Sequence, residues 1–361
     1  MKKVRPVLKY LIFFAIGVLL LWLAFRNKDQ EKILSAFQQA NYWWLVISVL
    51  CMLISDVSRA LRWTLLVRPL GYNLTHKHSF IAVMIGYLSN MIIPRMGELS
   101  RCVALNQTDD IPIDSLMGTV IVERVIDVFI LITLVGVTLL IEYDALIYFY
   151  QYVLTPKLDF DLIPYMKMEG GLLVLSLLLL LGGVYYFLHR KYGWSVVSQT
   201  VNRYYKGFKS GLSTIRSLES PWKFWAHTVL IWGMYWVMTY VVFFSFEATS
   251  QLDPIAGLAI FVIGSVGFIM PVQGGIGTYH WAVTEGFKLY GVSASIGLTF
   301  ATILHASQFL AILLVGGISY VLFLVIRYKK VRNKVDQPNA GDSEATDPSE
   351  ASPIDPSRYN S

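Results

Sequence analysis

Long apolar runs, separated by short polar or charged stretches, make up most of the first 334 residues of the chain. A helix that crosses a membrane needs about 20 apolar residues, and six of the runs have about that length. Two further apolar segments, 79–106 and 254–291, are interrupted near the middle by Pro94 and Pro271. The pattern predicts an all-α polytopic membrane protein with eight apolar segments. The six predicted full spans are 8–25, 43–66, 117–141, 171–188, 222–246 and 296–326.

Each interrupted segment has two arms that are short for full membrane spans. Pro94 begins a Pro-x-x-Gly element that ends at Gly97, and Pro271 begins one that ends at Gly274. A broken helix persists in a bilayer only within protein or beside a polar cavity, because its free backbone groups need partners. We interpret both segments as re-entrant helical hairpins. Two full crossings in each would give the same topology and remain an alternative.

The charged residues predict the orientation of the chain. Positive residues favour the cytoplasm, and they gather in 59–77, 189–223 and 327–334, whereas the loop 142–170 is acidic. If each interrupted segment contributes an even number of crossings, all basic loops and both termini are cytoplasmic. The halves 43–141 and 222–326 then form an inverted repeat of span, hairpin and span. In transporters, broken helices at matching positions of two halves mark the binding site.

The remaining segments complete the domain organisation. We predict a membrane domain over 1–334, a cytoplasmic amphipathic segment over 189–221, and a disordered tail rich in Asp, Ser and Pro over 335–361. The first apolar run follows a basic N-terminus without a small-residue cleavage site, which indicates an uncleaved span. The expected location is the inner (plasma) membrane.

Composition narrows the class of protein further. The chain is 55% hydrophobic and only 15% charged, which excludes a soluble domain. Its net charge of +6 comes from basic residues beside the spans, where they set topology and meet anionic lipid, so we expect no nucleic-acid partner. Cys51 and Cys102 lack metal or disulfide spacing and are predicted to be buried fillers. We expect no metal and no cofactor.

Charged residues inside apolar segments are the strongest functional signal. Glu123, Arg124 and Asp127 fall within one predicted span, and the spacing of four places Glu123 and Asp127 on one helix face. A lone charge at the bilayer centre costs about 2.5–3.5 kcal/mol. The three residues therefore need partners or a cavity. They either line a functional site or form an interfacial cluster near the end of the span.

The first hairpin tip is predicted to gather Asn90, Arg95, Glu98 and Arg101. The two guanidinium forks suit a phosphate, and Glu98 could pair with either of them or with Arg124. The alternative is a structural network of salt bridges that holds the hairpin in place.

A second charged group, Asp56, Arg59 and Arg62, lies near the cytoplasmic end of the second predicted span. The two arginines are candidates for a lipid headgroup site. The alternative is that they snorkel to the phosphates at the membrane surface, as long basic side chains commonly do.

The second hairpin tip is rich in glycine. Gly274, Gly275 and Gly277 allow the backbone to turn and to approach a ligand closely. Amides at the start of the returning helix favour an anion, and Gln273 and His280 add polar groups. This tip is therefore a second candidate headgroup contact.

No catalytic set is convincing. His280 and Glu285 are five residues apart and lie on poorly matched helix faces, and His305 is more typical of a satisfied interior histidine than of a proton relay. We therefore expect that the protein is not an enzyme. The sequence leaves two alternatives to a lipid transporter: a membrane-embedded transferase that acts on a lipid-linked donor through His280 and Glu285, and a scaffold for a neighbouring lipid-modifying enzyme.

Four motifs in order resemble the lysylphosphatidylglycerol synthase transmembrane-region family over about residues 8–330. They are Arg59-x-x-Arg62-Trp63, Asn90-x-x-x-Pro94-Arg95-x-Gly97-Glu98-x-x-Arg101, Glu123-Arg124-x-x-Asp127 and Pro271-x-x-Gly274-Gly275-x-Gly277. In larger members the membrane unit is thought to move an aminoacylated phospholipid between leaflets, while a separate cytoplasmic domain attaches the amino acid. Only a short tail follows Lys334 here, so the resemblance implies the flippase half alone.

The resemblance also bears on the lipid. Related members pair with glycosyltransferase domains or genes, which implies a lipid that could carry a sugar. Gln273 stands where the family usually has a second proline, and His280 where an acidic residue is common. The headgroup preference of this chain therefore does not follow from the resemblance.

We expect a protein that binds or moves an anionic or headgroup-modified phospholipid, or a polyprenyl-linked lipid, with a lipid-modifying enzyme as a possible partner. The arginines would hold the lipid phosphate, and the carboxylates would balance them and contact a cationic headgroup. The two sets are Arg95, Arg101 and Arg124, and Glu98, Glu123 and Asp127.

Overall fold

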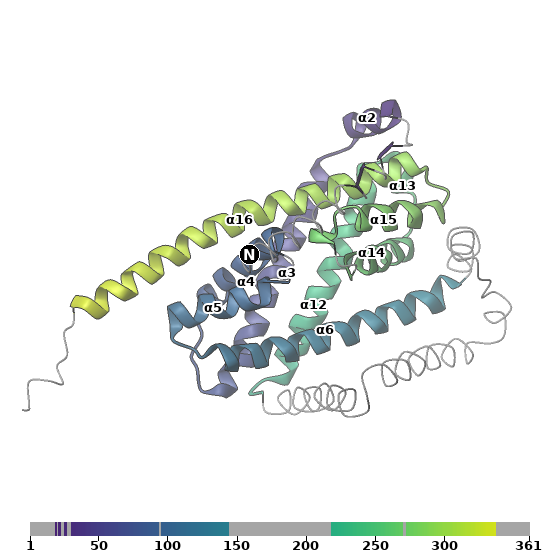
Figure 1. The fold of residues 1–361 in the computed structure, drawn as a ribbon. Coiled ribbons are helices and arrows are strands. Elements are labelled where there is room, and N and C mark those ends of the chain that lie inside the picture. Colours follow the sequence, from purple (N-terminus) through teal and green to yellow (C-terminus); the bar gives the residue numbers. More distant parts are fainter. Residues whose placement is uncertain are drawn as a thin grey trace, which may run out of the picture.

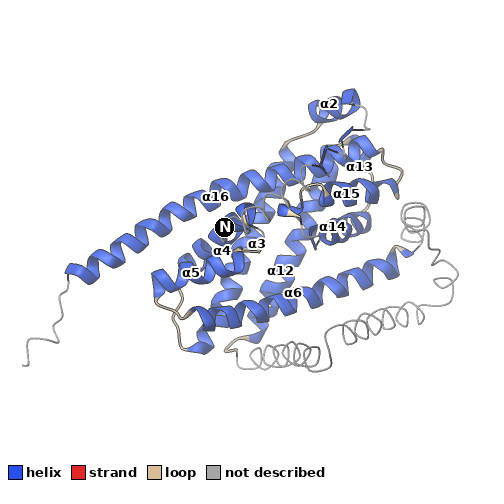
Figure 2. Cartoon of the chain, viewed as in Figure 1, coloured by secondary structure: helices blue, strands red, loops and turns tan. Residues whose placement is uncertain are grey.

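The computed structural model describes residues 19, 21–22, 25–26, 30–93, 95–143, 218–269 and 272–336. Within these residues the chain is helical and contains no strand (Figure 2). Most of the predicted span 8–25, the span 171–188, nearly all of the amphipathic segment 189–221 and nearly all of the tail lie outside the described residues. Pro94 and Pro271 also lie outside them.

Four long helices form the frame of the described part of the chain. They are α3 (Trp43–Val67), α6 (Ile113–Ile141), α12 (Pro221–Tyr240) with the 3-10 turn η3 (Val241–Ser245), and α16 (Ala294–Asp336). Each is long and apolar enough to cross a membrane. The helices fall close to the predicted spans 43–66, 117–141, 222–246 and 296–326, and α16 extends furthest beyond its prediction.

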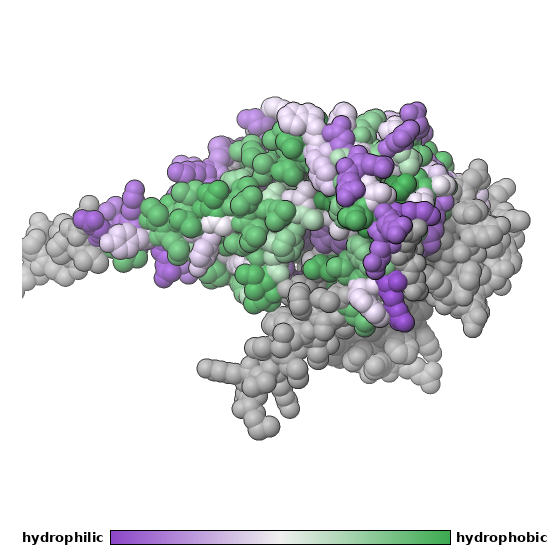
Figure 3. Space-filling view, turned by 90° about the horizontal axis from the view of Figure 1, so that it is seen from above, coloured by the Kyte–Doolittle hydropathy of each residue, from purple (hydrophilic) through white to green (hydrophobic). Residues whose placement is uncertain are grey.

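The outward faces of these helices are apolar and exposed. Leu140 on α6 is 82% exposed, and Val229 on α12 is 71% exposed. Hydrophobic residues also cover much of the face seen in Figure 3, including the α16 arm, whose far end is hydrophilic. Lipid tails replace water around such a surface, so these residues need no protein cover.

Between α3 and α6 the chain forms a pair of shorter helices, α4 (His76–Ile92) and α5 (Gly97–Asp109). The Thr75 hydroxyl caps α4 by accepting a hydrogen bond from the His78 amide at 3.3 Å. The residue that follows the helix, Ile93, has an extended backbone, as expected for the residue before a proline. A Cβ on Gly97 would lie 2.5 Å from Asn90 Nδ2, so only glycine lets the two arms approach this closely.

A second pair, α14 (Pro254–Ile269) and α15 (Thr278–Lys288), lies between α12 and α16. The turn between its arms contains η4 (Gln273–Gly275), and the φ angles of Gly274, Gly275 and Gly277 are +59°, +69° and +86°. These left-handed conformations explain the glycines at the tip. The order long helix, helix pair, long helix thus occurs twice in the described residues.

Helix α3 packs against α12 and α4, and α16 and α6 lie on opposite sides of this group (Figure 1). One hydrophobic core surrounds Trp63 and Met84 in the first half of the chain, and another surrounds Phe243 and Phe300 in the second. The described residues also contain three short elements, α2 (Gln30–Gln39), η1 (Arg68–Leu70) and α13 (Glu247–Ser250).

Candidate functional site

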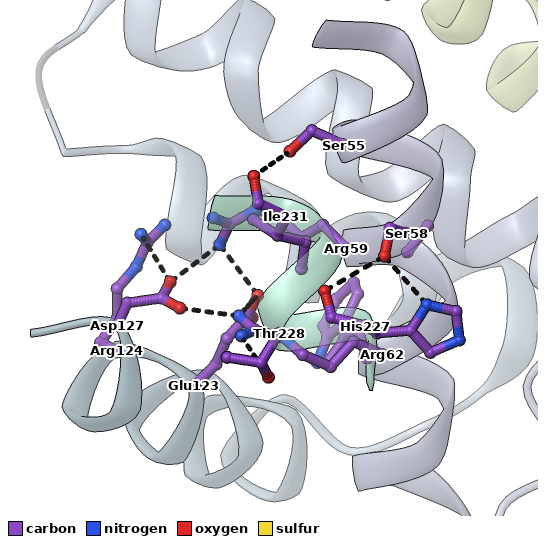
Figure 4. A network of polar contacts seen from close by, with 12 residues as sticks. Ser55, Ser58, Arg59, Arg62, Glu123, Arg124, Asp127, His227, Thr228 and Ile231 are labelled. Atoms are coloured by element: carbon purple, nitrogen blue, oxygen red, sulfur yellow. Dashed lines mark hydrogen bonds and ion pairs between the residues drawn. The ribbon is translucent and has the colours of Figure 1, made fainter. Parts of the chain in front are cut away.

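Charged side chains from α3, α5 and α6 meet in the interior and form a buried network around Glu123 (Figure 4). Oε1 of Glu123 accepts hydrogen bonds from Arg59 Nη1 and Arg62 Nη2, both at 3.0 Å. Its Oε2 accepts one from Arg101 Nη2 at 2.8 Å. Glu123 is fully buried. Three arginines therefore balance one carboxylate that water does not reach.

Asp127 lies one helical turn beyond Glu123 and binds the same two arginines of α3. Its Oδ2 accepts a hydrogen bond from Arg59 Nη1 at 3.0 Å, and its Oδ1 accepts one from Arg62 Nη2 at 2.9 Å. Each arginine of α3 thus bridges both carboxylates of α6. The predicted face shared by Glu123 and Asp127 is the face that carries the network.

Helix α12 and two aromatic rings complete this network. Arg62 Nη1 donates to Thr228 Oγ1 at 3.2 Å, and Arg59 Nη2 donates to the Tyr235 hydroxyl at 3.1 Å. The guanidinium carbon of Arg101 lies 4.6 Å from the centre of the Trp63 ring, which provides a cation–π contact. The arginines are thereby supplied with partners on several sides.

The alternative in which Arg59 and Arg62 snorkel to the membrane surface is wrong. Their exposed fractions are 4% and 0%. The carboxylates of α6 attract both side chains inward, where charge-assisted hydrogen bonds replace hydration. Sequence position near the end of a span does not reveal this, because the partners come from a helix some 60 residues away.

The four residues predicted at the first hairpin tip have different surroundings in the structure. Asn90 Oδ1 accepts a hydrogen bond from the Gly97 amide at 2.7 Å and so joins the two arms. Arg101 points inward to Glu123, one turn along α5 from Glu98. Arg95 is exposed, with φ +63°, and forms no ion pair with another described residue. The helical spacing directs these side chains to different surroundings.

Glu98 pairs with Arg124 on α6, which is one of its three predicted partners. Its Oε1 lies 3.1 Å from Arg124 Nη2, and the two side chains are 28% and 43% exposed. Arg124 Nη1 is also 3.8 Å from Asp127 Oδ2. This pair lies at the open edge of the otherwise buried network.

The second tip contains a histidine pair. His280 is buried, and its Nδ1 accepts a hydrogen bond from the Gly277 amide at 3.3 Å, which caps α15. The centres of the His280 and His305 rings are 5.0 Å apart. Gly275 is buried and Gly274 exposed. The backbone of Gln273 begins η4, close to α4.

The second tip shows no catalytic arrangement among its described contacts. Glu285 forms an ion pair with Lys288 Nζ at 2.8 Å, and none of its hydrogen bonds or ion pairs reaches His280. Within the part of the chain that the structure describes, no three His, Cys, Asp or Glu side chains are grouped so that they could hold a metal ion.

A pocket of about 240 Å³ lies between α12, α14, α15 and α16. Its walls are mainly aromatic and apolar, with a few hydroxyl and amide groups. The lining residues are Trp232, Tyr235, Met238, Thr239, Phe261, Ser265, Phe268, Tyr279 and Gln308. The sequence does not predict this pocket. Its only signal is the aromatic richness of 222–240, which is equally typical of a lipid-facing helix.

Membrane-length helices, two internal helix pairs and a buried charge network beside an apolar pocket define a polytopic membrane protein with a polar interior. The chain belongs to the family described as "Lysylphosphatidylglycerol synthase TM region", which matches residues 8–316. It is also 21% identical over 316 residues to a UPF0104 membrane protein of Methanocaldococcus jannaschii, a match that covers 82% of this chain and 89% of that protein. No solved structure matches the chain.

Proposed function

We propose that this protein binds a membrane lipid in the pocket between α12, α14, α15 and α16 and moves it between the two leaflets. The observation that carries the proposal is the position of Tyr235. Its side chain lines the apolar pocket and also accepts a hydrogen bond from Arg59 of the charge network. An amphiphile needs such an arrangement, in which an apolar wall adjoins polar groups.

The pocket suits the apolar part of a lipid. Trp232, Phe261 and Phe268 supply flat hydrophobic surface, and Phe268 is 44% exposed. A volume of about 240 Å³ is below the range of about 300–1,000 Å³ typical of pockets that enclose a whole small molecule. The pocket therefore accommodates a segment of an acyl or polyprenyl chain, and the rest of the lipid remains in the bilayer.

The phosphate of the lipid would bind at Arg124. Arg59, Arg62 and Arg101 are already bound by buried carboxylates, and removing those partners costs several kcal/mol, about 3–5 for a buried pair. The Arg124–Glu98 pair is partly exposed, and pairs of that kind contribute only about 0–1 kcal/mol. A lipid phosphate can therefore replace Glu98 at little cost, and Arg95, three residues before Glu98, is a second exposed cation.

The two helix pairs serve as re-entrant hairpins in this proposal. The arms of the second pair have 16 and 11 residues. At about 1.5 Å per residue, an 11-residue helix covers about 16 Å, half of a hydrocarbon core of about 30 Å. The repeated order of long helix, pair and long helix supports an inverted repeat. The basic segments beside the spans support an inner-membrane location with cytoplasmic termini.

The test is a lipid-scrambling assay in liposomes that contain the purified protein and a fluorescent anionic phospholipid. Ser265→Phe places a ring in the pocket and should lower the rate several-fold. The matched control is Val229→Phe, at an exposed position of α12. Lipid retained by each purified variant is measured in parallel by mass spectrometry. Wild-type liposomes no faster than empty ones, or equal rates and equal retained lipid for both variants, would refute the proposal.

A further inference from the structure

One buried carboxylate remains outside the charge network. Asp56 lies on α3, one helical turn before Arg59, and is only 2% exposed. Its Oδ2 has no hydrogen-bond partner. The other buried carboxylates of the described residues, Glu123, Asp127 and Glu285, all form ion pairs with arginine or lysine. Asp56 is therefore the exception that needs a physical explanation.

The groups that face Asp56 come from three helices. Arg59 lies on the same helix, and its guanidinium is already bonded to Glu123, Asp127 and Tyr235. Tyr87 approaches from α4, beside both Asp56 and Tyr235, and its hydroxyl also lacks a hydrogen bond of good geometry. On α6, Glu123 and Asp127 lie behind Arg59. Asp56 and Tyr87 thus form a polar pair whose hydrogen bonds are incomplete.

The chemistry of this position selects the ligand. An ionised carboxylate that is buried without a partner is costly, and protonation removes that cost. A lipid amine would need space that a 2% exposed side chain does not offer. A metal cation would need several oxygen ligands, whereas Asp56 and the Tyr87 hydroxyl supply few, beside a guanidinium. A proton removes the buried charge, needs little space and binds to a single carboxylate oxygen, so it fits this position.

We propose that Asp56 takes up and releases one proton during each transport cycle, so that lipid movement is coupled to a proton gradient. The inference rests on the proposed function. Water at one membrane face supplies the proton that converts the carboxylate to the carboxylic acid, and the acid returns it at the other face. Ionised Asp56 attracts Arg59 and competes with Tyr235, whereas protonated Asp56 leaves Arg59 on Tyr235. The charge of Asp56 thereby controls a contact in the pocket wall.

The isosteric variant Asp56→Asn tests the proposal in two measurements, with Asp114→Asn at an exposed position of α6 as the matched control. The first is infrared difference spectroscopy of purified protein between buffers of about pH 6 and about pH 9, because exposed carboxyl groups, with ordinary pKa values of about 4, stay ionised throughout that range. A carboxylic-acid carbonyl band should appear in wild type and in Asp114→Asn and be absent in Asp56→Asn. This readout does not require any transport. The same band in all three proteins would overturn the assignment to Asp56.

The second measurement is transport of fluorescent lipid in liposomes with an imposed pH gradient. One proton per lipid allows a gradient of one pH unit to shift the lipid distribution by up to about tenfold. Wild type and Asp114→Asn should show a shift, and Asp56→Asn should distribute lipid equally with or without the gradient. Wild-type transport that does not depend on the pH gradient would overturn the coupling but would remain consistent with the proposed function. Absence of any wild-type transport overturns both, and the infrared band then decides only whether Asp56 binds the proton.

Discussion

The hydroxyl of Tyr235 accepts a hydrogen bond from Arg59 at 3.1 Å, while the side chain of Tyr235 forms part of the pocket wall. A single side chain thus connects the charged interior of the first half of the chain to the apolar pocket of the second half. A change in the position of Arg59 would therefore shift Tyr235 and alter the pocket wall.

Replacing Tyr235 by phenylalanine should lower lipid transport several-fold while the protein stays folded. The ring and therefore the pocket wall are kept, but Arg59 loses one hydrogen bond, worth about 1.5–3 kcal/mol for a charged donor. The rate is measured in the liposome assay, and folding is checked by gel filtration. The control is Tyr320→Phe, at an exposed position of α16. Equal transport by both variants would show that the Arg59–Tyr235 contact has no role.

Glu123→Gln should destabilise the protein severely. The neutral side chain leaves Arg59, Arg62 and Arg101 without the carboxylate that all three share, and breaking a buried ion pair costs about 3–5 kcal/mol. We expect a marked drop in the thermal unfolding temperature in detergent, or loss of folded protein. Asp114→Asn removes an exposed carboxylate from the same helix and should leave stability unchanged. A Glu123→Gln protein as stable as this control would contradict the network.

Gly97→Ala should separate the arms of the first hairpin. The added Cβ would clash with the Gly86 carbonyl oxygen and with Asn90 Nδ2, and overpacking of this kind costs about 1–3 kcal/mol. Gly118→Ala is the matched control, because a Cβ there meets nothing within 4 Å. Thermal unfolding of both variants is compared with wild type. If Gly97→Ala unfolds no earlier than Gly118→Ala, the arms are not packed as described.

Glu142→Gln should raise stability at neutral pH and have no effect in acid. Burial, and after it the charge of Asp253, raises the pKa of Glu142 at the end of α6 above its ordinary value. The folded state therefore binds this proton more tightly, and wild-type stability falls as pH rises from the ordinary carboxyl pKa through the raised one. Unfolding temperatures are measured against pH. A gain that is largest in acid would have the opposite sign and refute the assignment.

The sequence alone predicts the long helices, but it does not predict which residues pair with the charged side chains inside them. Apolar runs of membrane length located α3, α6, α12 and α16, because the period and length of a hydrophobic run are local properties. The glycines of the second tip were found for the same reason, since each positive φ is a property of one residue. The direction in which the Arg59 and Arg62 side chains point is not a property of the local sequence. It depends on carboxylates that the fold brings to them from α6.

By itself, the sequence determined that this is a helical membrane protein, that its family is recognisable from four motifs, and that Glu123 and Asp127 share one helix face. Only the tertiary structure decided that these carboxylates bind Arg59, Arg62 and Arg101, that Tyr235 connects them to a pocket, and that Asp56 remains without an ion pair. The reason is physical. A buried charge is stabilised by whichever opposite charge the packing brings within about 3 Å, and packing joins helices that lie far apart along the chain.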